Sequence, residues 1–225
     1  MLLLGIDTCG EIGSVALVRA ATDGGRDHRL EVLGSAELPG KTYSSLLVLT
    51  VKDLLERAQC RLGELTALVV VNGPGSFTGV RVGVSAAKGL AEATGIPVVA
   101  VSRLAVLAAK AADGPVCAAL DAGRGELYAR FSASGSPPHE ALLRPGELLD
   151  AIEPGTRLLV CEEIVAGVLG TVAPELVEVP TAADAVRLAF ARVIAREFDD
   201  VAWLDGNYLR RSDAEIFSKA KTLAV

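Results

Sequence analysis

One arrangement of residues occurs twice in this chain, and the repetition limits the folds that the chain can adopt. The stretches "LLLGIDTCGEIGSVALV" (Leu2–Val18) and "VCAALDAGRGELYARF" (Val116–Phe131) each contain an apolar strand, an aspartate, a glycine-bearing turn and a second strand. Asp7 and Asp121 hold matching positions in the two copies. One motif that opens each half predicts a duplicated fold of two similar subdomains. Strand–turn–strand sequences are also common hairpins, so a chance likeness stays open as the alternative.

Apolar runs and helical patterns surround these motifs in an order that predicts an α/β fold, with hairpin strands on one side of each sheet. The expected strands are Leu2–Ile6, Ser14–Ala20, Leu30–Leu38, Ala67–Val71, Val98–Val101, Val116–Leu120, Leu127–Ser132 and Leu158–Cys161. The expected helices are Tyr43–Gln59, Thr78–Thr94, Arg103–Ala112, Gly146–Ile152, Ile164–Val172 and Ala182–Phe198. We expect the first subdomain over residues 1–102, the second over 103–212, and a tail over 213–225 whose packing on the first subdomain is left open. The Pro-rich stretch 134–140 is expected as a surface loop.

The charge balance argues against a protein that binds nucleic acid by itself. The chain of 225 residues has 22 Lys and Arg against 28 Asp and Glu, a net charge of −6. Nucleic-acid-binding proteins usually present a basic field, because the neutralisation of phosphates supplies most of the affinity. A role in RNA chemistry through a basic partner stays open.

The N-terminal residues and the cysteines favour a cytoplasmic protein. "MLLLGID" has no basic n-region, and Asp7 ends its apolar run too early for a signal peptide. The uncharged run Leu65–Val80 is too short and too interrupted to cross a bilayer. The four cysteines lie far apart without a CxxC pair, which is typical of reduced, buried thiols.

The glycine-rich stretch "NGPGSFTGVRVGVSAAKGL" (Asn72–Leu90) first suggests a phosphate-binding loop, because it links a strand to a helix. It matches neither known fingerprint, since the Walker A motif and G-x-G-x-x-G both require glycine where Thr78 or Val80 stands. Its backbone N–H groups could still face an anion at the helix N-terminus. Ser76 or Thr78 is expected to cap this helix.

Small residues form a stripe on the helix that follows. Gly79, Gly83, Ala86 and Ala87 share one face, which Leu90 closes. Glycine inside a helix costs up to about 1 kcal/mol relative to alanine, so the stripe indicates close approach of another backbone. That backbone belongs either to another chain or to the protein's own sheet, and the spacing does not decide between them. The preceding helix is apolar most of the way round, so the two helices together predict a protein–protein surface.

The two aspartates offer a second candidate site. A carboxylate at a strand end beside a Gly/Thr turn is where phosphate-handling enzymes hold Mg²⁺, and Thr8 and Ser14 would complete the first such hairpin. An Asx-turn that stabilises the corner is the alternative. The only histidines, His28 and His139, are expected in loops and form no HxxxH pair, which disfavours a zinc site or a hydrolase triad.

Five segments resemble one family in order and spacing, from residue 5 to residue 215. They are "GIDTCGEIGSVAL", "NGPGSFTGVRVGVSAAKGL", "GIPVVAVSRLAVLA", "ALDAGRGELYARF" and "YLRRSDAE". The family is bacterial TsaB, also called YeaZ, a relative of TsaD within the glycoprotease-like superfamily. The resemblance implies an actin/Hsp70/sugar-kinase-like (ASKHA) fold with two RNase H-like subdomains. TsaB acts with TsaD and the ATPase TsaE to make threonylcarbamoyladenosine beside the anticodon of tRNAs that read ANN codons.

The resemblance further implies a non-catalytic partner that forms a heterodimer with TsaD. TsaD carries the metal-binding histidines and transfers the threonylcarbamoyl group, so no catalytic residue, metal or cofactor is expected in this chain; ATP and metal belong to the partners. Asp7, Thr8 and Asp121 remain only as candidates for a vestigial phosphate loop. The chain would contact tRNA indirectly, through the complex. The implied interface residues lie on the helices over 43–59 and 77–94: Tyr43, Leu46, Leu47, Thr50, Gly79, Val80, Gly83, Ala86, Ala87 and Leu90.

One residue departs from the family pattern, and several alternatives stay open. The family usually has a histidine before Ser or Thr at the start of the first helix, where this chain has Tyr43-Ser44. A homodimer of the free chain through the same helices is an alternative to the heterodimer. A glycoprotease-like peptidase and a stand-alone nucleotide-binding ATPase are the alternative functions.

Overall fold

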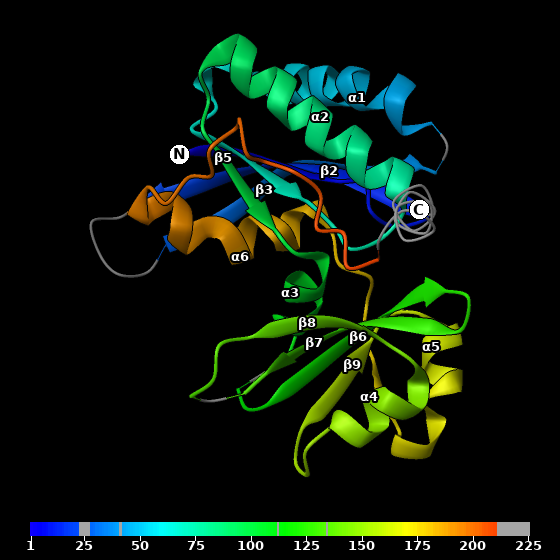
Figure 1. Ribbon diagram of the computed structural model, residues 1–225. Coiled ribbons are helices and arrows are strands. Elements are labelled where there is room, and N and C mark those ends of the chain that lie inside the picture. Colours follow the sequence, from blue (N-terminus) through cyan, green and yellow to red (C-terminus); the bar gives the residue numbers. More distant parts are fainter. Residues whose placement is uncertain (23–27, 41, 112, 134, 211–225) are drawn as a thin grey trace, which may run out of the picture.

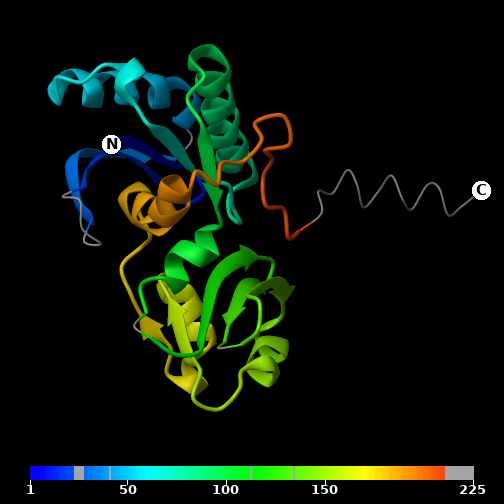
Figure 2. The same cartoon turned by 90° about the vertical axis from the view of Figure 1, so that its left-hand side faces the viewer.

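Two lobes, each built on a five-stranded mixed sheet, make up the protein (Figures 1 and 2). The computed structural model describes residues 1–22, 28–40, 42–111, 113–133 and 135–210. The strand order is β3-β2-β1-β4-β5 in the first sheet and β8-β7-β6-β9-β10 in the second. In both, the first three strands along the chain are antiparallel and the other two run parallel to the first. The two sheets therefore share one topology, which confirms the predicted duplication.

The first lobe is a three-layer sandwich. Its strands are β1 (Leu2–Asp7), β2 (Ile12–Thr22), β3 (His28–Pro39), β4 (Ala67–Val71) and β5 (Val98–Val101). Helices α1 (Tyr43–Arg57) and α2 (Phe77–Thr94) cover one face, and α6 (Ala182–Ala195) covers the other (Figure 1). Because both faces are covered, every residue of β1 and β4 is buried, and both strands read as almost unbroken apolar runs.

The second lobe is smaller. Its strands are β6 (Val116–Gly123), β7 (Glu126–Ser132), β8 (His139–Leu143), β9 (Arg157–Val160) and β10 (Glu175–Leu176). Its helices are α3 (Arg103–Ala108), α4 (Pro145–Ala151) and α5 (Glu163–Val168), and 3₁₀ turns occur at η1 (Leu62–Glu64) in the first lobe and η2 (Gly170–Val172) in the second. Alternate residues of β6 face opposite sides: Cys117 packs with α4 and α5, and Ala118 packs with α3.

Two short strands were missed by the sequence patterns. The stretch 134–140 was expected as a surface loop, but β8 begins within it, at His139. His28 was also expected in a loop, but it is the first residue of β3. Neither histidine therefore lies in the loop predicted for it. Prolines directly before β8 hid it, since proline breaks strand patterns and is tolerated only at strand ends and edges. The two-residue β10 is too short to leave any pattern.

The expected division into residues 1–102 and 103–212 is wrong for the C-terminal part of the chain. Helix α6 returns to the first lobe and packs on β1, β2, β4 and β5. At its start, the backbone N–H of Ala182 donates a 2.8 Å hydrogen bond to the Ser14 hydroxyl, and Gly5 leaves room for the Ala182 carbonyl. The physical reason for this return is that the first sheet would otherwise expose one of its apolar faces to solvent. The predicted tail over 213–225 lies outside the described residues.

Candidate functional site

Helix α1 has more apolar surface than its own sheet can cover. Its inner face, with Tyr43, Leu47 and Val51, is buried on the first sheet. On its outer side Val48 and Leu49 are 63% and 62% exposed. An amphipathic helix normally turns polar residues to solvent, so this second apolar face is a candidate surface for another chain.

The small-residue stripe of α2 faces the protein's own sheet. The Thr8 hydroxyl donates a 2.6 Å hydrogen bond to the carbonyl oxygen of Gly79. A Cβ at Gly79 would overlap the Thr8 carbonyl, and one at Gly83 would overlap the Thr8 hydroxyl. Val80 and Ala87 are buried as well. These four residues were expected at the partner interface, and that expectation is wrong because Thr8 fills the space beside Gly79 and Gly83, and Val80 and Ala87 are buried in the core of the first lobe.

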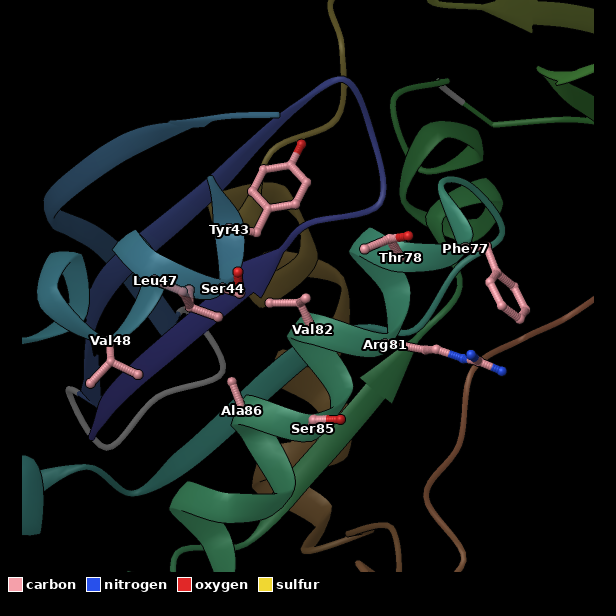
Figure 3. A pocket seen from close by; sticks show the side chains of 10 residues that line it. All are labelled: Tyr43, Ser44, Leu47, Val48, Phe77, Thr78, Arg81, Val82, Ser85 and Ala86. Carbon is pink, nitrogen blue, oxygen red and sulfur yellow. The ribbon is translucent and has the colours of Figure 1, made fainter. Parts of the chain in front are cut away.

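The surface that α2 does present lies one position away from the stripe. Val82 and Ala86 point toward α1 and, with Ser44 and Val48 of α1, border a groove of 450 Å³ (Figure 3). We call this site the α1/α2 groove. Its other lining residues are Tyr43, Leu47, Phe77, Thr78, Arg81 and Ser85.

Of the expected interface residues, Leu46 is exposed, and Thr50, Ala86 and Leu90 are partly exposed. Tyr43 and Leu47 are buried and reach the groove only at its floor. Sequence reasoning missed Val82, although Val82 and Ala86 stand four residues apart on one face. Because glycine is costly inside a helix, Gly79 and Gly83 suggested an interface on their own face of α2, which is the wrong face.

Tyr43 fastens the start of α1 to the β1–β2 turn. Its hydroxyl lies 2.7 Å from the carbonyl oxygen of Gly10 and 2.9 Å from that of Glu11. Burial raises the pKa of the Tyr43 hydroxyl, and the negative charge of Asp7 adds to this. The phenol therefore stays protonated and acts as a donor at neutral pH.

Asp121 lines a cavity of 820 Å³ between the lobes, whereas Asp7 is buried and does not line it, and both aspartates make the bond of an Asx-turn. The Asp7 carboxylate accepts a 2.8 Å hydrogen bond from the N–H of Cys9, and the Asp121 carboxylate accepts a 2.9 Å bond from the N–H of Gly123. The hydroxyls of Thr8 and Ser14, which were candidates to complete a metal or phosphate site, bond to Gly79 and Ala182 instead. The Asx-turn considered as the alternative for Asp7 and Asp121 is therefore present at both corners.

Arg103 is the cation of this cavity. It is 6% exposed, and its guanidinium lies 4.0 Å from Glu162, whose other carboxylate oxygen accepts a 2.6 Å bond from the N–H of Asp121. Burial raises the pKa of Asp7, while the charge of Arg103 and the bond from Cys9 oppose that rise. The charge of Arg103 therefore opposes the rise in the pKa of two carboxyl groups, Asp7 in the first lobe and Glu162 in the second.

The glycine-rich loop between β4 and α2 is bonded to the β1–β2 turn and to the start of α3. The N–H of Ser76 donates a 2.8 Å hydrogen bond to the carbonyl of Cys9, and the Ser76 hydroxyl accepts from Gly79 as the predicted cap. Gly73 has φ +110°, a backbone conformation that favours glycine, and its carbonyl accepts a 2.6 Å bond from the N–H of Arg103. Gly73 therefore shapes the turn between β4 and α2 and attaches that turn to the start of α3.

The described residues contain neither a metal-binding cluster nor a membrane-spanning helix. No group of three or more His, Cys, Asp or Glu in that part of the chain could hold a metal ion. No helix there is long and apolar enough to span a membrane.

The sequence relatives decide the family. Residues 37–194 match the family model of TsaD, tRNA N6-adenosine threonylcarbamoyltransferase. The chain is 36% identical over 132 residues to the tRNA threonylcarbamoyladenosine biosynthesis protein TsaB of Escherichia coli, an alignment that covers 57% of this chain and 53% of that protein. The Bacillus subtilis TsaB is also 36% identical, over 130 residues, with the same two shares covered. This chain belongs to the TsaB/YeaZ family.

The similarity to TsaB/YeaZ proteins also holds for the three-dimensional structure, over most of the chain. The structure of YeaZ from Pseudomonas aeruginosa has a TM-score of 0.73 and 28% identity, covering 92% of this chain and 100% of that one. A second structure, of an uncharacterized protein similar to peptidase YeaZ from Pseudomonas aeruginosa, has a TM-score of 0.76 and 28% identity, covering 93% and 99%. The expected α/β fold of two similar subdomains is confirmed. By sequence, however, the chain spans only about half the length of the curated TsaB relatives it matches.

Proposed function

We propose that this TsaB/YeaZ chain is a non-catalytic subunit in the biosynthesis of threonylcarbamoyladenosine in tRNA, and that it binds a TsaD-type protein through the α1/α2 groove. The observation that carries the proposal is the exposed apolar face of α1 beside this groove, with Val48 and Leu49 more than half exposed. Exposed apolar surface next to a groove marks protein–protein sites. No catalytic residue is assigned to the chain.

The similarity to the TsaD family supports a dimer in which two chains of the same fold pack through the same pair of helices. The segment that matches the TsaD family model, residues 37–194, includes both α1 and α2. Two chains with the same fold can pack the same helix pair against each other about a two-fold axis, as in isologous dimers. The same geometry would serve a homodimer of the free chain, so the heterodimer is proposed as the working state.

Charge and side-chain inventory support the division of roles. A chain of net charge −6 is suited to reach tRNA through its partner rather than directly. Cys9, Cys117 and Cys161 are buried, and burial raises the pKa of each thiol, which leaves them poor nucleophiles for a peptidase. ATP and metal are assigned to the TsaD-type protein and to TsaE, which would join the complex, and the site of action is the cytoplasm.

A pair of alanine-to-arginine variants on helices tests the docking surface. Ala86 borders the groove on α2, whereas Ala191 is exposed on α6, on the opposite face of the first sheet. We expect Ala86→Arg to weaken binding to the TsaD-type protein of the same organism by on the order of tenfold or more, and Ala191→Arg to leave it unchanged. Calorimetric titration measures both. Wild-type affinity of a folded Ala86→Arg chain would remove the groove from the proposal.

Reconstitution tests the role itself. The TsaD-type protein, TsaE, tRNA and threonylcarbamoyl donor are combined with and without this chain, and modified adenosine is counted. We expect product only when the chain is present. Tight binding of ATP and Mg²⁺ by the isolated chain would instead favour the ATPase alternative, and cleavage of peptides would favour the peptidase.

A further inference from the structure

Exposed aromatic side chains gather on the side of α2 that faces away from α1. The single tryptophan of the chain, Trp203, is 85% exposed, and Phe77 and Tyr208 are 42% and 37% exposed. All three border a cavity of 760 Å³ between α2 and the segment that follows α6. Tryptophan is usually well buried in folded proteins, so exposure to this degree calls for an occupant.

The patch is held in place by contacts within the chain. The rings of Phe77 and Tyr208 lie 5.3 Å apart at 51°, and the Arg81 guanidinium lies 3.8 Å from the centre of the Phe77 ring. Lys88 donates a 3.0 Å hydrogen bond to the carbonyl of Leu204, which ties the segment to α2. We call Phe77, Arg81, Lys88, Trp203 and Tyr208 the aromatic–cation patch.

The patch is positive on a chain that is negative overall. Neither Arg81 nor Lys88 forms an ion pair with an acid in the described part of the chain. Asp205 is the only carboxylate among the described residues that line the cavity, and it accepts a hydrogen bond from the adjacent N–H of Gly206. Two unpaired cations beside exposed rings complement an occupant that has both carboxylates and apolar groups.

The patch continues directly from the α1/α2 groove. Phe77, Arg81 and Ser85 line both cavities. Figure 3 shows Phe77 and Arg81 pointing away from α1, while Val82 and Ala86 point toward it. A protein that is seated on the groove therefore reaches the patch without leaving the surface of α2.

We propose that the aromatic–cation patch is a second contact for the partner that occupies the α1/α2 groove, and that it holds an acidic segment of that partner with Trp203 as the apolar anchor. The inference rests on the proposed function, because it takes the partner from it. Trp, Tyr and Arg are the residues that most often dominate protein–protein affinity. RNA fits less well, since stacking needs several open rings in succession and Arg81 already covers one face of Phe77.

The test compares patch, groove and control variants for binding to the TsaD-type protein of the same organism. The patch variants are Trp203→Ala and Lys88→Glu, because Trp203 and Lys88 line the patch cavity and not the groove, and the groove variant is Ala86→Arg. The matched controls are Val168→Ala, an exposed apolar residue of the second lobe, and Arg29→Glu on β3. We expect each patch variant to weaken binding by on the order of tenfold, and the loss for Lys88→Glu to shrink as salt rises; the controls bind like the wild type.

The outcomes separate the two proposals. If Ala86→Arg weakens binding and both patch variants bind like the wild type, the patch inference is overturned and the groove stands. If only the patch variants weaken binding, the groove assignment is wrong, and the patch remains a contact for the TsaD-type protein without the groove. A third arm titrates the isolated chain with single-stranded oligoadenylate while Trp203 fluorescence is recorded. Unchanged fluorescence supports a protein occupant; saturable quenching that Trp203→Ala abolishes would show that the patch takes RNA instead.

Discussion

The hydroxyl of Thr8 donates a 2.6 Å hydrogen bond to the carbonyl oxygen of Gly79, and this contact seats the first turn of α2 on the end of β1. Both groups are buried. The contact is close enough that only glycine fits at position 79, because a Cβ there would overlap the Thr8 carbonyl. The position of α2, and with it one wall of the α1/α2 groove, depends on this pair.

Substitution of two glycines on the same helix should have opposite effects. We expect Gly79→Ala to lower the free energy of unfolding by about 2 kcal/mol or more, because the added methyl forces α2 away from β1. Gly89 is exposed with nothing within 4 Å of an added Cβ, so Gly89→Ala should raise the free energy of unfolding by about 0.5–1 kcal/mol. Urea unfolding measures both. Equal effects of the two substitutions would contradict the packing described for Gly79.

Removal of the Tyr43 hydroxyl should also destabilise the fold. Tyr43→Phe leaves the carbonyls of Gly10 and Glu11 without their shared donor, and we expect a loss of about 1 kcal/mol in the free energy of unfolding. Tyr208→Phe is the matched control, because that hydroxyl has no hydrogen bond within the described residues. Thermal unfolding of both variants gives the comparison. A Tyr43→Phe protein as stable as the control would show that the hydroxyl does not fasten α1.

The cysteines should differ in their reactivity toward a thiol reagent. Burial raises the pKa of Cys117 to about 12 and that of Cys161 to about 11, and it raises the pKa of Cys9 well above its usual range. Cys60 is only half-buried, which departs from the expectation of four buried thiols. In Ellman's assay at neutral pH we expect one fast thiol in the native chain, none in Cys60→Ser, and four after denaturation. Two or more fast thiols in the native wild type would conflict with this burial.

The lowered pKa of Asp184 should make the free energy of unfolding depend on pH in acidic solution. Burial alone raises the pKa of its carboxyl, but the hydrogen bonds from Thr181 and the charge of Lys110, 3.1 Å away, outweigh it and hold the pKa below its usual range. A lowered pKa in the folded state contributes stability above the unfolded pKa, about 3.9, and that contribution is lost as pH falls through the folded value.

We therefore expect Asp184→Asn to be about 1 kcal/mol less stable than the wild type at pH 7, with a difference that narrows below about pH 4. The exposed Asp150 provides the control variant, Asp150→Asn, which should follow the wild type at every pH. Urea unfolding over a pH series measures the differences. A gap between Asp184→Asn and the wild type that stays constant down to pH 3 would rule out the charge as its source.

Most of the strands and helices could be predicted because their apolar runs are long and their periods clear. Thus Ala67–Val71 and Val98–Val101 agree with the structure at both ends. The side of a helix that packs inward could not be predicted, because Gly79 and Gly83 have the same spacing whether a foreign helix or β1 approaches them. The return of α6 to the first sheet was hidden for a similar reason: its apolar face fits any sheet, and only the topology decides which one.

That return has a consequence for the order in which the protein is made. The first 101 residues contain every strand of the first sheet, yet one face of that sheet stays uncovered until Ala182–Ala195 has left the ribosome. The strands and helices from Arg103 to Leu176 emerge before α6 and need no later segment to close their sheet. We therefore expect the lobe that is encoded second to reach its protease-resistant form first during synthesis.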